Sequence, residues 1–273
     1  MLTSLLITLR EGLEAALIVG IILAYLAKTR RSQLSRYAWL GVGAAVLASL
    51  AAGAAIYVTA GDLTGRGEQL FEGSAMLLAA GVLTWMIFWM RKEAANVRGS
   101  LQSQIDSKLA DGSWIGLAAL AFIAVAREGI ETVLFLFAAS RTAESPFWAT
   151  TGGLIGLALA VAVGYLLYRG TARLNLRTFF NATSVILIVF AGGMLAHGVH
   201  EFVEADIVPG IVAPVWNAAA FLPDESGFGR LLASLLGYSS DPSLTEVASW
   251  VLYLCAAFAG YFVPRNRQKL AVT

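Results

Sequence analysis

Seven long apolar stretches recur along the chain, each bounded by polar or charged positions. They cover residues 3–27, 37–60, 69–90, 114–138, 147–168, 178–200 and 246–263. A stretch of about 19 apolar residues spans the hydrocarbon core as one helix. None of the seven alternates apolar and polar positions with the period of a strand, which disfavours a β-barrel. The pattern predicts an all-α, polytopic membrane protein with seven transmembrane helices.

Composition supports a membrane protein and excludes several other classes. Charged residues are 14% of the 273 residues and the apolar set AVILMFWYC is 58%. A typical soluble domain has about 25% charged residues, and so few charges cannot cover a soluble globule this apolar. The 19 basic and 18 acidic residues nearly balance, so no excess charge favours a nucleic-acid partner. The single cysteine, Cys255, excludes an internal disulfide. We therefore expect the lipid bilayer to surround the chain.

The distribution of basic residues predicts the orientation. Basic side chains follow the first, third, fifth and seventh stretches, at Lys28, Arg30, Arg31, Arg36, Arg91, Lys92, Arg98, Lys108, Arg169, Arg173, Arg177, Arg265, Arg267 and Lys269. The opposite side has Arg66, Arg141 and Arg230. Since cytoplasmic loops carry the excess of Lys and Arg, the N-terminus is expected outside and the C-terminus in the cytoplasm. The expected location is the cytoplasmic, or inner, membrane.

Two longer segments connect the apolar stretches. In residues 91–113, a helical stripe of Leu101, Ile105 and Leu109 predicts a short helix on the inner membrane surface. Residues 201–245 form an outer loop with a leucine-rich piece at 230–236, which we expect to cap the outer face or to dock a partner.

One charged motif occurs twice inside the apolar stretches. Residues 10–14 read Arg-Glu-Gly-Leu-Glu and residues 127–131 read Arg-Glu-Gly-Ile-Glu. The first copy lies in a stretch expected to run inward and the second in one expected to run outward. This predicts a single permease domain over residues 1–273. Its parts are an inverted repeat, about 1–90 and about 114–204, and a seventh helix at about 246–263. Such repeats are typical of secondary transporters, which bind substrate near the membrane midplane.

The spacing of the motif indicates its chemistry. Residues i and i+3 share a helical face, so the two glutamates of each copy project together. A charge at this depth costs at least about 2.5–3.5 kcal/mol, so it must find partners inside the protein. Internal salt bridges alone do not suffice, because each copy has two carboxylates and one guanidinium. The surplus carboxylates indicate a hard cation, ferric iron or less specifically Ca²⁺ or Mn²⁺. The candidate metal ligands are Glu11, Glu14, Glu128 and Glu131, the supporting charges are Arg10 and Arg127, and the glycines expected to allow close approach of a helix or the ion are Gly12 and Gly129.

A second polar group lies at the outer ends of the third and sixth stretches. It consists of Glu68, Glu72, His197, His200, Glu201 and Glu204. The last four fall on one stripe of a helix, at i, i+3, i+4 and i+7. One interpretation is an outer vestibule that loads metal onto the central carboxylates. The alternative is ordinary solvated polarity at helix ends.

These motifs resemble the oxidase-dependent iron permeases, the family of the fungal high-affinity iron permease and the bacterial Efe-type iron-uptake permease. The family is marked by two Arg-Glu-Gly-Leu-Glu motifs in the first and fourth spans. Residues 83–90 (LTWMIFWM) and 191–202 (AGGMLAHGVHEF) resemble it too, and the bacterial form is the nearer match. The resemblance covers nearly the whole chain.

The resemblance implies a transporter, not an enzyme, that imports ferric iron as substrate and holds no permanent cofactor. It implies that the motif glutamates bind the iron. It also implies extracytoplasmic partner proteins that oxidise or bind iron, since the sequence has no cupredoxin-like or haem motif.

Three other functions use some of the same features. A divalent-cation/proton transporter would use the four glutamates as proton sites. A di-iron membrane oxidase usually shows Glu-x-x-His, which this sequence lacks. A retinal protein needs a lysine within a span, and none of the seven stretches contains one.

Overall fold

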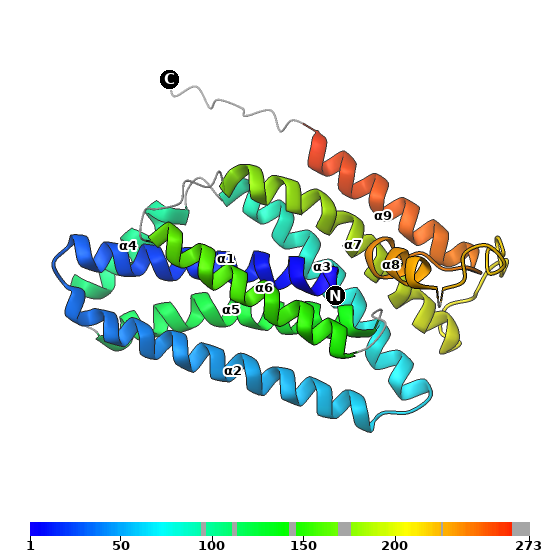
Figure 1. Cartoon of the computed structure of the whole chain (residues 1–273), viewed down its shortest axis with the longest axis horizontal. Coiled ribbons are helices and arrows are strands. Elements are labelled where there is room, and N and C mark those ends of the chain that lie inside the picture. The colour runs from blue at the N-terminus through cyan, green and yellow to red at the C-terminus, as the bar shows by residue number, and fades with distance from the viewer. Residues whose placement is uncertain (94–96, 111–113, 142–145, 169–175, 225, 264–273) are drawn as a thin grey trace, which may run out of the picture.

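The fold is a bundle of long helices, seen in a computed structural model that describes residues 1–93, 97–110, 114–141, 146–168, 176–224 and 226–263 (Figure 1). Within those ranges the regular structure is helical, without a strand. The long helices are α1 (Leu2–Lys28), α2 (Ser35–Asp62), α3 (Arg66–Glu93), α5 (Trp114–Arg141), α6 (Pro146–Tyr168), α7 (Leu176–Glu204) and α9 (Leu244–Phe262). The short ones are η1 (Ser32–Leu34), α4 (Val97–Ala110) and α8 (Gly227–Leu236).

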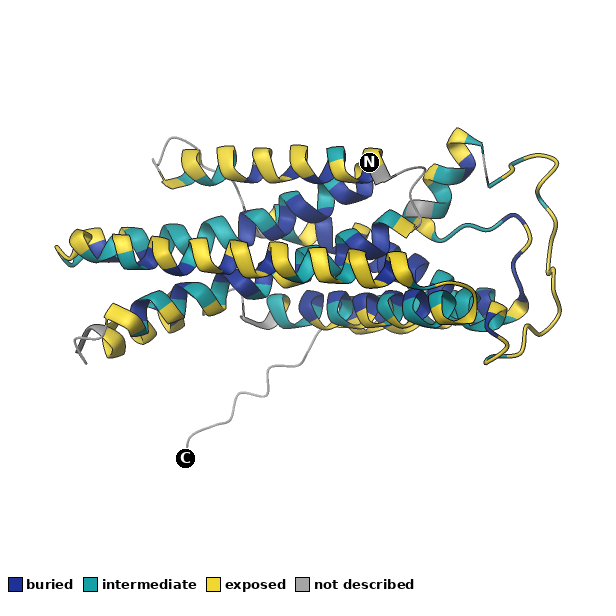
Figure 2. Ribbon diagram, turned by 90° about the horizontal axis from the view of Figure 1, so that it is seen from below, coloured by how far each residue is buried: buried dark blue, intermediate teal, exposed yellow. Residues whose placement is uncertain are grey.

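Each predicted apolar stretch coincides with one long helix to within a few residues. By length and composition, five helical segments of the described chain can cross a membrane: Ser32–Asp62, Arg66–Arg91, Phe147–Tyr168, Thr178–Glu204 and Leu244–Phe262. The two long helices outside this group are α1 and α5, which carry the two charged motifs. The chain is therefore an all-helical, multi-pass membrane protein. Its surface agrees, because exposed residues cover the outward helix faces and buried residues gather toward the middle (Figure 2).

The main apolar core lies between α1, α3, α5, α7 and α9. It contains Ile7, Met76, Phe135, Phe190 and Tyr261, each at most 7% exposed. A second cluster joins the other ends of α1 and α5, where Leu26 packs with Leu117. Because Ile7 meets Phe135 at one end and Leu26 meets Leu117 at the other, α1 and α5 run in opposite directions.

Two ladders of small residues hold the motif helices against their neighbours. On α6 the ladder is formed by Gly152, Gly156, Ala160 and Gly164, which face α1. On α2 it is formed by Gly41, Ala45, Ser49 and Gly53, of which Gly41, Ser49 and Gly53 face α5. Small residues at a spacing of four let helix backbones approach closely in a membrane. The paired helices run parallel, since Met1 meets Gly152 while Ala16 meets Gly164, and the contacts of α2 with α5 advance in the same way.

The motif glycines lie within these two interfaces. A Cβ atom added to Gly12 would sit 2.6 Å from Cβ of Ala160, and one added to Gly129 would sit 2.8 Å from Cβ of Ser49. The close helix approach expected at both glycines is therefore present.

The segment 91–113 contains the short helix that the sequence predicted, and the outer loop contains one that it did not predict. On α4, Leu101 and Ile105 are buried against α1 and α5, while the side chain of Leu109 lies outside the described residues. The leucine-rich piece forms α8, which begins at the Ser226 cap and ends at Gly237, whose φ of 73° suits glycine.

The predicted orientation rests partly on residues outside the described ranges. These are Arg169, Arg173, Arg265, Arg267 and Lys269, together with the side chains of Lys92, Arg98 and Arg177. The orientation therefore stays a prediction.

The glycine contacts predict that alanine substitutions at two glycines will differ in their effect on thermal stability. Gly129→Ala is expected to lower the apparent melting temperature of the detergent-solubilised protein, because overpacking a tight contact costs about 1–3 kcal/mol. Gly43→Ala on α2 is the matched control, since an added Cβ there meets nothing within 4 Å. The control should be neutral or slightly stabilising, because alanine favours a helix over glycine. Equal melting temperatures for the two variants would contradict the close contact at Gly129.

Candidate metal centre

The first motif places a fully buried arginine between two carboxylates. Arg10 is 0% exposed. Its Nη1 lies 3.0 Å from Oε1 of Glu11, and its Nη2 lies 3.2 Å from Oε1 of Glu14. Nη1 also donates to Sδ of Met86 on α3 at 3.4 Å. The guanidinium thus fixes both glutamates of α1 and ties that helix to α3.

The second motif repeats this arrangement with a more exposed arginine. Nε of Arg127 lies 2.9 Å from Oε1 of Glu131 and 3.8 Å from Oε1 of Glu128. The side chain of Arg127 is 32% exposed and stacks on two indoles of α3, with Cζ 4.5 Å from the ring of Trp89 and 5.5 Å from that of Trp85. The structure gives these indoles a specific contact with the motif arginine.

Three motif carboxylates from the two helices converge. Glu11 of α1 and Glu128 and Glu131 of α5 each offer an oxygen within 4.8 Å of the others. All three are buried, at 1%, 4% and 7% exposure. Glu14, the fourth predicted ligand, lies beside this group, facing Arg10 and interacting electrostatically with Glu128 and Glu131. Residues more than a hundred positions apart thus form one acidic cage.

The cage contains polar atoms that the protein leaves without a hydrogen bond. Among the described residues, the buried oxygens without such a partner include one each from the four motif glutamates, and the nitrogens include Nε of Arg10 and Nη2 of Arg127. Buried polar groups are almost always paired, so buried oxygens without a hydrogen bond on three converging carboxylates indicate a site for a cation, while Oε1 of Glu14 has the ion pair with Arg10. Four carboxylates and two guanidiniums carry a formal charge of −2, which one divalent cation would neutralise. Carboxylate oxygens are ligands that hard cations and iron accept.

Apolar side chains separate the cage from the ends of the helices. On the side of Glu72 and Arg141 the core residues Ile7, Met76 and Phe135 are at most 2% exposed. On the opposite side, Ile22, Leu26 and Ile105 are buried. Buried apolar residues therefore lie on both sides of the cage.

The outer residues form two groups of contacts, and Glu201 interacts electrostatically with members of both. In the first group, Glu68 and Glu72 of α3 pair with Arg141 at the end of α5: Nη2 of Arg141 contacts Oε1 of Glu72 and lies 3.3 Å from Oε1 of Glu68. Glu201 of α7 interacts electrostatically with Glu72. The sequence placed Arg141 on the outer side without assigning it a partner.

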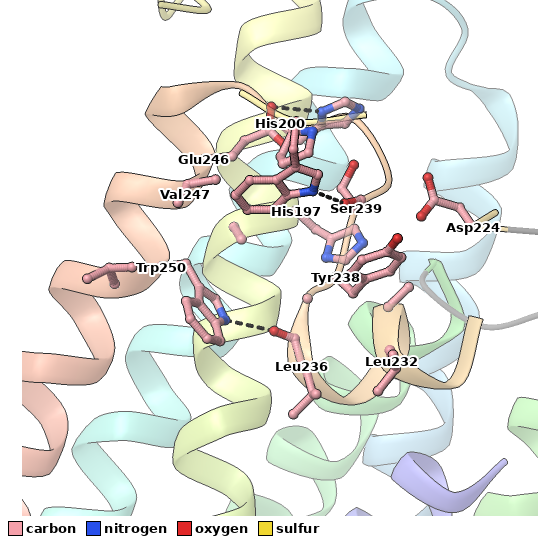
Figure 3. Close-up of a pocket in the computed structure, with 16 residues that line it drawn as sticks. His197, His200, Asp224, Leu232, Leu236, Tyr238, Ser239, Glu246, Val247 and Trp250 are labelled. Atoms are coloured by element: carbon pink, nitrogen blue, oxygen red, sulfur yellow. Dashed lines mark hydrogen bonds and ion pairs between the residues drawn. The ribbon is translucent and has the colours of Figure 1, made fainter. Parts of the chain in front are cut away.

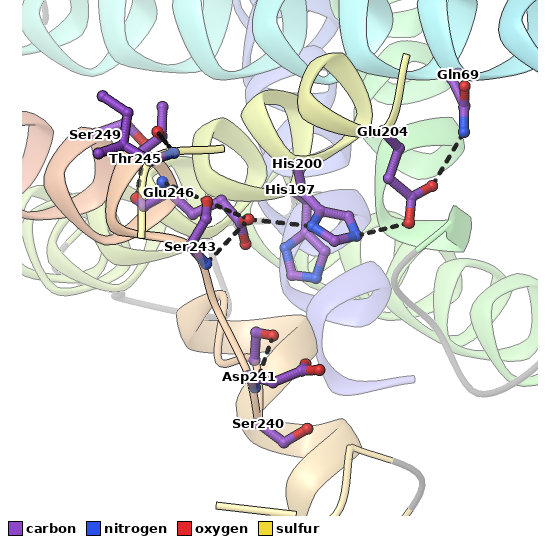
Figure 4. A network of polar contacts seen from close by, with 12 residues as sticks. Gln69, His197, His200, Glu204, Ser240, Asp241, Ser243, Thr245, Glu246 and Ser249 are labelled. Carbon is purple, nitrogen blue, oxygen red and sulfur yellow. Dashed lines mark hydrogen bonds and ion pairs between the residues drawn. The ribbon is translucent and has the colours of Figure 1, made fainter. Parts of the chain in front are cut away.

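His200 belongs to a separate polar chain that links three helices (Figure 4). Its Nε2 lies 3.2 Å from Oε1 of Glu204, and its Nδ1 lies 3.2 Å from Oε1 of Glu246 on α9. Glu204 accepts a hydrogen bond from Gln69 of α3, and Glu246 accepts one from Ser243 at 2.6 Å. Glu246 was missed by the sequence reasoning. The spacing of Ser243 and Glu246 signals a capping box, which the structure contains, but not the contact with His200.

His197 lies one helical turn from His200 and lines a cavity (Figure 3). Its Nδ1 lies 3.0 Å from the carbonyl oxygen of Gly193, and its ring lines a cavity of about 580 Å³ between α7, α8, α9 and the outer loop. The cavity walls include Asp224, Tyr238 and Trp250. Thus His197 and His200 share this cavity, while Glu68 and Glu72 lie with Arg141.

Buried carboxylates at the middle of a helical bundle are typical of membrane proteins that move cations or protons. The chain matches the iron permease FTR1 family over residues 1–265 and belongs to that family.

Curated relatives agree over nearly the full length. The ferrous iron permease EfeU of Escherichia coli O6:H1 (strain CFT073) is 41% identical over 266 residues, 97% of this chain and 96% of the relative. EfeU of Shigella sonnei is likewise 41% identical, and that of Yersinia pestis is 37% identical over 266 residues, 94% of its length. No solved structure matches this chain significantly.

The comparisons confirm the resemblance to the bacterial iron permeases, and the chain is a permease rather than an enzyme. The name of the family states that its members transport iron. The names of the relatives specify ferrous iron, where the resemblance had implied ferric iron. The ferric form is therefore not supported.

The two motif arginines are expected to differ in their effect on stability. Arg10→Gln leaves two deeply buried carboxylates without their cation, and breaking such a buried pair costs about 3–5 kcal/mol. Arg127→Gln should lower the apparent melting temperature less, because Arg127 is partly exposed. Thermal unfolding of both variants in one detergent would measure this. A larger loss for Arg127→Gln would show that burial does not decide the difference.

Proposed function

We propose that this protein imports iron across the cytoplasmic membrane through the cage formed by Glu11, Glu128 and Glu131, with Glu14 as a fourth carboxylate beside it. The observation that carries the proposal is the convergence of buried carboxylate oxygens without hydrogen bonds. Arg10 and Arg127 hold the carboxylates in place and reduce their mutual repulsion when no ion is bound.

All seven long helices cross the membrane in this proposal, with the N-terminus outside. The charges on α1 and α5 are compatible with spanning because the motif glutamates are buried inside the bundle. At about 1.5 Å per residue, 27 or more residues reach about 40 Å, enough for a hydrocarbon core of about 30 Å.

The helix contacts support an inverted repeat of α1–α3 and α5–α7. In this repeat, α5 corresponds to α1, α6 to α2 and α7 to α3. The contact between α2 and α5 then corresponds to the contact between α6 and α1, and both helix pairs are close and parallel. The same correspondence leaves the α1–α5 and α3–α7 pairs unchanged. Rocking of the two halves around the cage would then open it to each side in turn.

Ferrous iron is the form we propose for the cargo. The names of the relatives support it, as does the formal charge of −2 on the motif side chains. A divalent cation moving inward across 100 mV gains about 4.6 kcal/mol, at about 2.3 kcal/mol per charge. The membrane potential therefore suffices to drive import without a nucleotide.

The outer polar residues are proposed to receive the ion before it reaches the cage. Glu68, Glu72 and Glu201 gather near Arg141, whereas His197, His200 and Glu204 lie toward α9. We also propose that iron-binding partner proteins act on this face; the iron-oxidising partner that the family resemblance implies would fit a ferric cargo instead.

Iron uptake into proteoliposomes tests the cage. With ⁵⁵Fe²⁺ kept reduced by ascorbate and an inside-negative potential, Glu131→Gln or Glu128→Gln should lower initial uptake by about tenfold or more. Mutation of a residue that only supports a metal ligand typically lowers metal affinity or activity by about 10–100-fold, so loss of a ligand should have at least a comparable effect. Asp62→Asn, an exposed carboxylate at the end of α2, is the matched control and should leave uptake unchanged. Unimpaired uptake by both cage variants would refute the proposal.

The same vesicles distinguish the form of iron and the coupling. Uptake of ⁵⁵Fe²⁺ should exceed that of ferric citrate, and it should proceed without any added partner protein. Uptake that follows an imposed pH gradient and accepts Mn²⁺ equally would instead favour the divalent-cation/proton transporter.

A further inference from the structure

Arg141 forms ion pairs with two outer carboxylates of α3. It is the last residue of α5, and its Nη2 contacts Oε1 of Glu72 and lies 3.3 Å from Oε1 of Glu68, one helical turn away. A single guanidinium nitrogen therefore bridges two carboxylates of α3. The side chain is 36% exposed, so an ion arriving from solvent can reach it.

Glu72 depends on Arg141 for its compensation. Its side chain is 6% exposed, and its buried Oε1 is the atom that Nη2 of Arg141 contacts. Glu201 of α7 adds a second negative charge nearby. A buried carboxylate with a like charge beside it is costly, so Arg141 is the group that neutralises it.

Arg141 and Glu72 lie where they could control the passage of a cation to the cage. Arg141 lies ten residues after Glu131, about 15 Å along the same helix. The buried side chains of Met76 and Phe135 lie between the two levels. A cation bound at Glu72 would be held directly outside this apolar layer.

We propose that Arg141 is a tethered competitor cation at Glu68 and Glu72, and that an incoming iron ion must displace it, which selects against weakly binding cations. This rests on the proposed function. An arginine stays protonated at any physiological pH, so the competition is always present. Among first-row divalent metals, affinity for protein donors rises from Mn²⁺ to Fe²⁺, so Fe²⁺ displaces the guanidinium more readily than Mn²⁺ does.

Binding of Mn²⁺ followed by electron paramagnetic resonance tests the competition without transport. The background is the Glu128→Gln/Glu131→Gln protein, whose cage is disabled. Adding Arg141→Gln should tighten Mn²⁺ binding by about tenfold, which is the effect of removing an interaction of about one ion pair. Adding Arg66→Gln, the same charge change at an exposed site of α3 with no contact to Glu68 or Glu72 among those described, should change it little.

Two further variants keep the test decisive. Glu72→Gln placed on top of Arg141→Gln should remove the gain in affinity. Arg141→Lys keeps the charge and should stay near the parent affinity, with the same elution on size-exclusion chromatography. An affinity unchanged by Arg141→Gln, or raised equally by Arg66→Gln, would overturn the proposal.

Uptake measures the selectivity itself. With the cage intact, Arg141→Gln should make ⁵⁵Fe²⁺ uptake more sensitive to added Mn²⁺, lowering the half-inhibiting concentration by about tenfold. Equal sensitivity in wild type and variant would contradict the selectivity role. If the wild type fails to take up iron, the proposed function fails, while the Mn²⁺ result still decides the role of Arg141.

Discussion

The rest of the structure depends on one constraint, the cost of burying carboxylates in an apolar bundle. Four glutamates and two arginines lie in the two motif helices, and Arg10 has no contact with solvent. Each guanidinium pairs with the two glutamates of its own helix, which makes burial tolerable, but the charges do not cancel. The remaining negative charge is what a cation site requires.

The packing of the helices serves this constraint. Small residues on α2 and α6 bring these helices close to α5 and α1, with Gly12 and Gly129 directly beside the motif carboxylates. Large apolar residues such as Phe135 and Ile7 lie on one side of the cage, and α4 packs over the opposite end. The motif glutamates are thereby buried, so their charges interact strongly with one another and with a bound ion.

Local patterns in the sequence predicted the helices and the glutamates that come together, whereas the role of these glutamates as metal ligands stays a prediction. Apolar stretches located each long helix, and the charged motifs named the glutamates that converge. The outer region was less predictable. The contacts of Arg141 with Glu72 and of His200 with Glu246 join residues that are distant in sequence. The spacing of residues along one helix cannot predict such contacts. Likewise, residue spacing could not separate Glu14 from the three carboxylates that share one center, since that depends on how α1 is rotated against α5.

The most direct test of the account is an anomalous diffraction map at the iron absorption edge from crystals soaked with Fe²⁺ under anaerobic conditions. The account predicts a peak between Glu11, Glu128 and Glu131, within coordination distance of their free oxygens. It also predicts that the peak disappears in Glu128→Gln crystals soaked in the same way. An iron peak found elsewhere in the bundle, with no density in the cage of a transport-competent protein, would contradict the central claim.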